Sequence, residues 1–324
     1  MRNTLGVRGV TNMSGPIYKY VGPAIIGEVL SGLDCVHLKC SHPEDFQDPY
    51  ELSLTIDFAV EPEALAFYQE VVGELPQLPT TCFSKSPAII PMWAHYAFKL
   101  EGAVLEFDEH LVQESCPESS FGDVEYRDGL HDGLNGMLHR AHVIGKPRYV
   151  YFLQSGVFHA AYFTKATCWS YELERRMVIQ EANVRHEPPL MLLDVPIACV
   201  TSVVAGPRAS EATKALLREF AAHAGTRYLE MRVGRSAAAP YFVEPEGTPH
   251  QFNGERIEAS SQYCGICGEP TRSGDLCSWC AMEDAHREQA ASSNPFRMLA
   301  DAGMLESYLD GMDAIGRVKH GDDA

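Results

Sequence analysis

The residues of this chain best placed for chemistry are two glutamates in the stretch CWSYELERR, residues 168–176. Glu172 and Glu174 are separated by a single residue, so on a β-strand both carboxylates would project from the same face. One carboxylate of such a pair could stabilise positive charge that develops in a transition state, while the other accepts a proton. The pattern also allows a different interpretation, in which the glutamates belong to a solvated strand face and form a cross-strand ladder of charges.

Four cysteines near the C-terminus are the second group whose spacing suggests chemistry. Two C-x2-C pairs, separated by nine residues, lie in YCGICGEPTRSGDLCSWC and comprise Cys264, Cys267, Cys277 and Cys280. Each pair can turn two thiolates toward one point, which completes the tetrahedral sulfur site that Zn(II) prefers. Four protein ligands leave no position for water, so we expect a structural zinc ion in a small knuckle or ribbon. Two disulfides would need an oxidising compartment, and redox chemistry would need a thioredoxin-like surround, so both are weaker interpretations.

A cluster of acidic residues earlier in the chain offers a third kind of chemistry. It comprises Glu44, Asp45, Asp48 and Glu51. Carboxylates at this density could hold a metal ion for a nuclease or another hydrolase. The simpler interpretation is that they cap and solvate a turn.

The composition limits the class of protein. With 324 residues, 45% of them hydrophobic and 22% charged, the sequence is typical of a soluble globular protein with one large domain and an appendage. The formal net charge of -18 disfavours a protein that coats nucleic acid by neutralising its phosphates. No apolar run reaches the roughly 18 to 20 residues that span a bilayer, and the start MRNTLGVRGV lacks the apolar stretch of a secretory signal. We therefore expect a cytoplasmic protein with no membrane partner.

The elements that must position these residues follow an α+β pattern. Besides a strand that carries the two glutamates, periodicity predicts strands at residues 17–22, 50–60, 80–86 and 103–108, and helices at residues 62–75 and 210–225. Composition divides the chain into a core of residues 1–245, a polar linker of residues 246–262, a zinc module of residues 263–282, and a helical, partly flexible tail of residues 283–324.

Several segments of the core together resemble one bacterial family, domain of unknown function 2971. The matching segments are IYKY (17–20), DFQDPYE (45–51), CFSKSPAIIPMWAHYA (82–97), EGAVLEFD (101–108), KATCWSYELERRMV (165–178) and VTSVVAGPRAS (200–210). The chain departs from the family pattern at Gln47, where asparagine is usual, and at Glu101, where histidine is usual. The four cysteines lie outside the resemblance.

The order of these motifs is similar to that of ADP-ribosyltransferases, especially the branch that modifies nucleic acids. The resemblance implies a mixed, split β-sheet core with flanking helices and an enzyme that uses NAD. Glu174 would orient the ribose and Glu172 would assist the acceptor. By its charge, Lys19 or Arg176 could meet the pyrophosphate, because a fixed cation matches a phosphate oxyanion. The remaining positions that the resemblance assigns to the NAD pocket are Tyr18, Tyr20, Trp93, His95 and Tyr96.

The chemistry of NAD cleavage suits these residue types. Breaking the nicotinamide bond passes through an oxocarbenium-like state, which a carboxylate can stabilise while aromatic faces clamp the nicotinamide ring. The acceptor would be a macromolecule, either protein or nucleic acid. A role as a toxin or phage-defence effector follows from the resemblance alone.

A non-catalytic binding protein is the alternative from another functional class. Its zinc module would dock a partner, and the tail segment NPFRMLADAGMLESYLDGM is amphipathic enough to pack on a partner or on the core. A metal-dependent nuclease or hydrolase that uses the acidic cluster is the third hypothesis. The sequence leaves the oligomeric state open.

Overall fold

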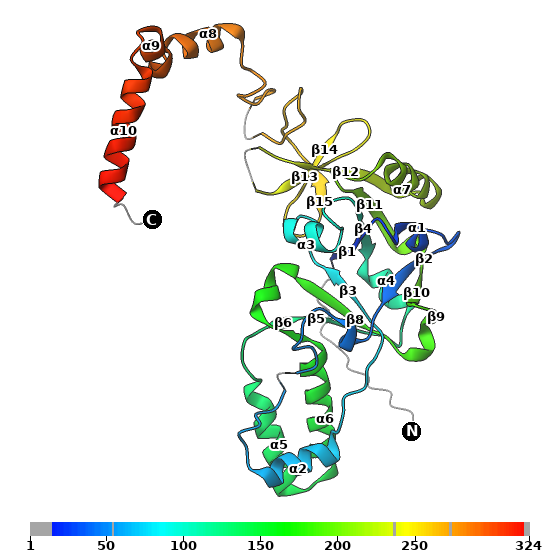
Figure 1. Cartoon of the computed structure of the whole chain (residues 1–324). Helices are drawn as coiled ribbons and strands as arrows, with labels where there is room; N and C mark the ends of the chain where they lie inside the picture. The colour runs from blue at the N-terminus through cyan, green and yellow to red at the C-terminus, as the bar shows by residue number, and fades with distance from the viewer. Residues whose placement is uncertain (1–14, 54, 236–237, 272–273, 321–324) are drawn as a thin grey trace. The chain divides into compact units, whose positions relative to one another are not determined.

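The computed structural model describes residues 15–53, 55–235, 238–271 and 274–320. The chain divides into two compact units, of which the first ends at Ser260 and the second begins at Ser261. The first unit is a mixed α+β fold with one large sheet and flanking helices, which confirms the fold class expected from the sequence (Figure 1).

Ten strands form the main sheet of the first unit, in the order β15-β14-β13-β12-β11-β4-β1-β3-β8-β5. In chain order they are β1 (Pro16–Val21), β3 (Thr80–Ser84), β4 (Ala103–Asp108), β5 (Ser120–Asp123), β8 (Glu174–Val178), β11 (Val200–Ala205), β12 (Arg227–Val233), β13 (Pro240–Val243), β14 (Pro249–Phe252) and β15 (Ile257–Ala259). Strands β1, β3 and β4 confirm three of the strands that periodicity predicts.

Helix α7 (Glu211–Ala224) joins β11 to β12, which are the parallel pair of the sheet. The helix begins where the Ser210 hydroxyl accepts a hydrogen bond from the backbone N–H of Thr213, and it ends at Gly225 in the left-handed conformation. Its buried side chains, among them Leu217 and Phe220, belong to the main hydrophobic core. The predicted helix at residues 210–225 is therefore confirmed.

The sheet is almost divided between β1 and β3. Strand β1 pairs with β4 along its whole length, and β3 pairs with β8 along its whole length. Between β1 and β3, in contrast, the only residues in register are Tyr18 and Ser84. The side chain of Lys19 bridges the two strands, because its ammonium donates to Thr81 Oγ1 at 2.7 Å and to the Cys82 carbonyl at 2.9 Å. Two blocks of strands thus meet at one narrow junction.

Three helices form a small second core within the first unit: α2 (Pro62–Val71), α5 (Asp132–Ile144) and α6 (Pro147–Tyr162) (Figure 1). Buried Ile56 packs into this core. The described residues around it form turns and bends, so the strand expected at residues 50–60 is wrong, and residue 54 lies outside the described part. The apolar residues of this segment pack against helices instead of alternating on a sheet.

Shorter elements complete the first unit. One small sheet contains β2 (Cys35–Cys40), β10 (Leu190–Pro196) and β9 (Arg185–Glu187), and another contains β6 (Glu125–Tyr126) and β7 (Thr164–Lys165). The short helices are α1 (Ile26–Val29), α3 (Ile90–His95) and α4 (Glu109–Ser115).

The segment expected to be a linker, residues 246–262, is part of the main sheet. It supplies β14 and β15, which pair with each other and, through β14, with β13. Ile257 is buried in a core cluster and Phe252 packs against the same cluster. Polar composition concealed a short edge hairpin, because only a few of its residues face the core.

The second unit contains the four cysteines followed by α8 (Asp284–Ser292), α9 (Pro295–Asp301) and α10 (Leu305–His320). The helical character expected of residues 283–324 is confirmed through residue 320, and residues 321–324 lie outside the described part. Among the described helices, none has the length and apolar character needed to cross a bilayer.

Candidate functional site

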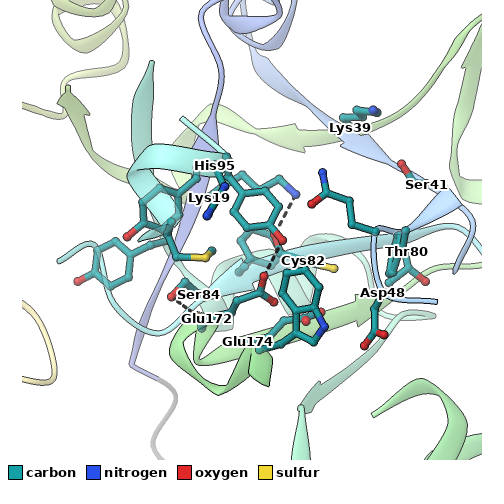
Figure 2. A pocket seen from close by; sticks show the side chains of 18 of the residues that line it. Lys19, Lys39, Ser41, Asp48, Thr80, Cys82, Ser84, His95, Glu172 and Glu174 are labelled. Atoms are coloured by element: carbon teal, nitrogen blue, oxygen red, sulfur yellow. Dashed lines mark hydrogen bonds between the residues drawn. The ribbon is translucent and has the colours of Figure 1, made fainter. Parts of the chain in front are cut away.

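A pocket of about 360 Å³ opens at the narrow junction between β1 and β3 (Figure 2). Of the residues expected at the NAD site, those that line it are Tyr18, Lys19, Tyr20, His95, Tyr96, Glu172 and Glu174. They come from β1, from the end of α3, from the 3-10 helix that ends at Glu172 and from the start of β8. The separation of the strands leaves room for these side chains to face one space.

The two glutamates reach this pocket from different elements. Residues Thr167–Glu172 form a 3-10 helix, and Leu173 turns the backbone with a φ of 46°, so that β8 begins at Glu174. The expectation that one strand carries both carboxylates is therefore wrong. The turn is held by Ser84, whose hydroxyl donates to the Glu172 carbonyl at 2.7 Å, and by the Lys85 N–H, which donates to the Leu173 carbonyl at 3.0 Å.

The ammonium of Lys165 connects the two carboxylates. It donates to Glu172 Oε2 at 2.6 Å and to Glu174 Oε2 at 3.1 Å. The side chains of both glutamates are 3% exposed and that of Lys165 is 8% exposed. The hydroxyl of Tyr96 donates to the other oxygen of Glu172 at 2.5 Å. These carboxylates are thus buried and fixed, and the interpretation as a solvated ladder of charges is wrong for them.

Arg176 supports Glu174 from behind the pocket. Its side chain is fully buried, and its Nε donates to Glu174 Oε1 at 2.7 Å. The two terminal nitrogens donate to the two oxygens of Glu51, each at 2.9 Å. The expectation that Arg176 meets a pyrophosphate is therefore wrong, because its guanidinium has no surface on the pocket and already pairs with two carboxylates.

The pairing determines the protonation of the site. Burial by itself raises the pKa of Glu174, but the charges of Arg176 and Lys165 outweigh burial and lower the pKa to about 2. Burial lowers the pKa of Lys165, but Glu174 and Glu172 more than reverse this effect, so its pKa is raised. By formal charge, the three carboxyl groups of the cluster exceed the two cations by one. The floor of the pocket is therefore suited to a group that carries or develops positive charge.

Tyrosines form the walls of the pocket. The hydroxyl of Tyr20 donates to the Ser86 carbonyl at 2.9 Å, and burial raises the pKa of this tyrosine. The hydroxyl of Tyr18 donates to Glu106 Oε1 at 3.4 Å, and burial together with Glu106 raises its pKa. Both phenols stay protonated at physiological pH as a result. Tyr20 keeps a small exposed surface that a ligand could contact, whereas Tyr18 is fully buried in a core cluster.

Trp93 lies in the core beneath these rings and does not line the pocket. It is fully buried, its indole N–H donates to the Pro87 carbonyl at 2.7 Å, and its ring packs edge-on against Tyr20 with centroids 5.5 Å apart. The expectation that Trp93 clamps a nicotinamide is wrong for this reason. Trp169 lines the pocket instead, with its ring 4.9 Å from the Lys165 ammonium.

Two lysines stand near the pocket without a carboxylate partner in the described part of the chain. Lys19 donates only to neutral groups of β3, and burial lowers its pKa. Lys39 is exposed and lines the pocket from β2. Figure 2 shows Lys39 and Ser41 on one side of the pocket and Ser84 with Glu172 on the other. The end with Glu172 is thus negative, and the rest of the lining carries Lys39 together with the carboxylates of Asp45 and Asp48.

Lys165 and Trp169 are two of the lining residues that sequence analysis did not identify. Both lie inside KATCWSYELERRMV, close to the glutamates. Their relation to Glu172 and Glu174 follows no strand or helix period, because a 3-10 helix and a turn separate them. The sequence feature that could have indicated them is their residue type, because a lysine and a tryptophan lie within ten residues of the two glutamates.

The four cysteines of the second unit form a compact sulfur cluster. Their sulfur atoms all lie within 4.8 Å of one another, and Cys267 and Cys277 are 3.8 Å apart. Both C-x2-C turns close in the same way: the N–H of Gly268 donates to the Cys264 carbonyl at 2.8 Å, and that of Ala281 donates to the Cys277 carbonyl at 2.9 Å. Gly268 has a φ of +70°, which glycine adopts without strain. This arrangement could bind a metal ion.

The acidic cluster of residues 44–51 does not form a comparable group. In the described part of the chain, the potential metal-binding groups of three or more side chains are the four cysteines and the set Cys35, His37 and Asp194. The latter set lies beside Arg185, which donates to Asp194 at 3.2 Å. Glu51 belongs to the Arg176 ion pair and is unavailable to a metal.

No family model, curated protein or solved structure matches this chain. The resemblance to domain of unknown function 2971 and to ADP-ribosyltransferases therefore stays a prediction.

Proposed function

We propose that the protein is an NAD-dependent ADP-ribosyltransferase that modifies a macromolecule, either protein or nucleic acid. The observation that carries the proposal is the buried pair Glu172 and Glu174, fixed by Lys165 inside a pocket with tyrosine walls. NAD contains a cationic nicotinamide ring and an anionic diphosphate. The negative floor and the unpaired lysines of the pocket match this distribution of charge.

In this mechanism Glu174 acts on the ribose of NAD and Glu172 acts on the acceptor. The bond between ribose C1′ and the nicotinamide nitrogen breaks, and its electron pair neutralises the nicotinamide ring. Glu174 stabilises the positive charge that remains on the ribose, while Tyr96 holds the nicotinamide. An acceptor nucleophile then bonds to C1′ and gives its proton to Glu172, which acts as the general base.

The diphosphate is assigned to Lys19 and Lys39 in place of Arg176. An ammonium matches a phosphate oxygen as a point charge and does not require bidentate geometry. Lys19 is already fixed by two hydrogen bonds to β3, so little additional ordering would accompany binding.

The test is the release of nicotinamide from NAD, together with a gain in mass on protein and on nucleic acid acceptors. Glu174→Gln should lower turnover by about 100- to 1000-fold, which is typical for the loss of one group that stabilises the transition state. Glu109→Gln is the matched control, because Glu109 is a buried glutamate paired with Arg175 outside the pocket. Equal turnover in wild type and Glu174→Gln would remove Glu174 from the mechanism.

We also propose that the cysteine cluster holds a structural zinc ion. Four thiolates within 4.8 Å suit the tetrahedral coordination of Zn(II) and leave no ligand position for a reaction. The role of such an ion would be to hold the second unit together.

Docking of a macromolecule on the second unit is the second candidate function. Apolar side chains project from the cysteine turns into solvent: Ile266 is 68% exposed and Trp279 is 66% exposed. Exposed apolar groups on so small a unit favour a contact with a partner. A metal-dependent nuclease that uses residues 44–51 is disfavoured, since Glu51 is held by Arg176 and the acidic residues of this segment belong to neither described group of potential metal ligands.

A further inference from the structure

Three side chains that can bind a metal ion lie on one face of the small sheet of β2, β10 and β9 (Figure 1). Cys35 and His37 are two residues apart on β2, so their side chains project from the same face. Asp194 of β10 is the antiparallel partner of His37, which places its side chain on that face as well. The sulfur, nitrogen and oxygen ligand atoms all lie within 4.8 Å of one another. Strand pairing therefore brings a thiol, an imidazole and a carboxylate together.

A positively charged nitrogen lies where two of these ligand atoms meet. Nη2 of Arg185 is 3.2 Å from His37 Nδ1 and 3.2 Å from Asp194 Oδ1. The two ligand atoms are 2.6 Å apart, and the sulfur of Cys35 is 3.9 Å from the same Nδ1. The imidazole nitrogen and the carboxylate oxygen thus face a position that suits a cation.

Gly32 helps to determine which imidazole nitrogen faces this position. A Cβ atom at Gly32 would lie 3.0 Å from the Cys35 sulfur and 3.1 Å from His37 Nε2. The backbone before β2 thus lies close to Nε2, while Nδ1 is directed at Asp194. Because only 14% of the His37 side chain is exposed, its ring has little room to turn.

Small movements would give these ligand atoms tetrahedral coordination. Bond lengths of about 2.3 Å to sulfur and about 2.0 to 2.2 Å to nitrogen and oxygen separate tetrahedral ligand atoms by about 3.3 to 3.6 Å. The observed separations of 3.9 Å and 2.6 Å differ from these values by less than about 1 Å. The Asp194 side chain is 47% exposed and can make this adjustment. Arg185 also pairs with Glu187, so its guanidinium keeps a carboxylate partner when an ion displaces it from Asp194.

We propose that Cys35, His37 and Asp194 form a second zinc site, weaker than the four-cysteine cluster. Thiolate and imidazole ligands favour Zn(II) over Mg²⁺ and Ca²⁺, which prefer oxygen. On binding, the Cys35 thiol loses its proton to solvent, so the thiolate and the carboxylate balance the two charges of the ion. Three protein ligands leave the fourth position to water. The site is the weaker of the two because it has one ligand fewer and because Arg185 must be displaced. It takes no part in the proposed transfer of ADP-ribose.

Calorimetry measures the binding of added zinc to the full wild-type chain. Prior dialysis without a chelator empties the weaker site and leaves the four-cysteine cluster its ion, so we expect one further zinc per chain. Cys35→Ala should raise the Kd at least about 100-fold, since losing a direct ligand costs more than the 10- to 100-fold that is typical of an outer-shell partner. Asp194→Asn changes an exposed side chain and should raise the Kd about 10- to 100-fold. His110→Ala is the matched control and should leave the Kd unchanged, because His110 pairs with Glu114 on the surface and belongs to neither described group of potential metal ligands.

Arg185→Met tests whether the guanidinium and the ion compete for one position. Its Kd for the added zinc should fall about 5-fold, which is the effect of one unit charge about 4 Å away in water. An unchanged or higher Kd would show that the two cations do not share a position, and the assignment would be overturned.

Cobalt(II) identifies the thiolate ligand by its absorption. Added to the chain whose cluster holds zinc, cobalt should give a sulfur-to-cobalt charge-transfer band in wild type. Cys35→Ala keeps the cluster and should lack this band, so its spectrum is the baseline. A wild-type spectrum without the band would overturn Cys35 as a ligand.

Two further outcomes would overturn the site as a whole. In the first, wild type takes up no zinc beyond the ion of the cluster. In the second, Cys35→Ala and Asp194→Asn bind the added zinc as tightly as wild type, which would place the binding elsewhere.

Discussion

Lys165 determines whether the two glutamates can remain buried together. Removing its ammonium leaves two carboxylates, each 3% exposed, to repel each other in a space from which water is largely excluded. We expect Lys165→Met to lower the free energy of unfolding by about 3 to 5 kcal/mol, as measured by urea denaturation. Lys214→Met is the control, because Lys214 pairs on the surface with Glu211; its effect should stay below about 1 kcal/mol. Equal stability of Lys165→Met and wild type would contradict a central role for this ammonium.

The protonation of Glu174 makes the stability of the first unit depend on acid pH. Its pKa falls from the usual value of 4.5 to about 2 in the folded protein, so the folded state binds this proton less readily than the unfolded state does. The stabilisation is complete above pH 4.5 and is lost as the pH falls from 4.5 through 2. By linkage it amounts to about 3 kcal/mol.

Urea denaturation between pH 7 and pH 2 measures this contribution. Glu174→Gln lacks the titrating group, so its unfolding free energy should decline less steeply than that of wild type below pH 4.5. Burial and the charge of Glu174 both raise the pKa of Glu51, so Glu174→Gln also lowers the pKa of Glu51, and the difference between the two curves reports both carboxyl groups. Parallel curves for the two proteins would show that Glu174 does not titrate as described.

Sequence analysis identified site residues whose position depends on neighbouring residues in the chain. It misplaced residues whose position depends on contacts with distant segments. The tyrosines of β1 could be found because they alternate along a short strand, and the glutamates because they lie two residues apart in one short segment. Whether Trp93 faces the pocket or the core depends on how α3 packs, and only the fold determines that. Arg176 likewise was assigned by its charge, while its buried partner Glu51 lies 125 residues away.

At the scale of elements, the position of β1 in the pocket depends on the close approach of the backbone at the start of β4. Gly102 comes directly before β4, and a Cβ atom there would overlap the carbonyl oxygen of Val21 and lie 3.0 Å from that of Ala97. Both obstacles are backbone. The Val21 carbonyl can move aside only with β1, which carries Tyr18 and Tyr20, and the Ala97 carbonyl only with the segment that follows α3. We expect Gly102→Ala to lower the free energy of unfolding by about 1 to 3 kcal/mol and to weaken NAD binding.

Gly136→Ala is the matched control for this substitution. Gly136 lies in α5 with no atom within 4 Å of its Cβ position, so alanine should raise stability by about 0.5 to 1 kcal/mol through its higher helix propensity. Thermal unfolding of both variants measures the difference. If Gly102→Ala were as stable as Gly136→Ala, the backbone of β1 and β4 would be able to shift and accommodate the added methyl group, which would contradict the prediction.

The type of an element could be predicted where one hydrophobic period continued over the whole element. The prediction was wrong for short segments whose structure depends on the distant segment that they contact. The helix at residues 210–225 has a cap, a period and a glycine stop, and each of these is local. The turns around Ile56, the hairpin of β14 and β15, and the 3-10 helix before Glu174 depend on contacts with distant segments. From propensity alone, the turns around Ile56 were predicted as a strand, the hairpin as a linker, and the 3-10 helix as part of the strand that carries Glu174.

At the scale of the whole molecule, the division at Ser260 separates the pocket from the cysteine cluster. The sequence predicted a core, a linker, a zinc module and a tail. The strands β14 and β15 place most of the expected linker in the first unit, and the expected module and tail both lie in the second unit. Each unit has its own internal contacts. A change that removes the metal should therefore loosen the second unit and leave the pocket intact.

The metal assignment and this independence can be tested in one experiment. Wild type should contain about one zinc per chain by elemental analysis, whereas the combined variant Cys264→Ser and Cys277→Ser should contain almost none, because two of the four thiolates are lost. Cys168→Ser is the control, since Cys168 is an exposed cysteine outside the cluster. In hydrogen exchange, residues 261–271 and 274–282 should lose protection in the combined variant, while β1, β3 and β8 keep theirs. Retention of zinc by the combined variant would contradict the cluster as its site, and loss of protection in β1 and β3 would mean that the units are energetically coupled.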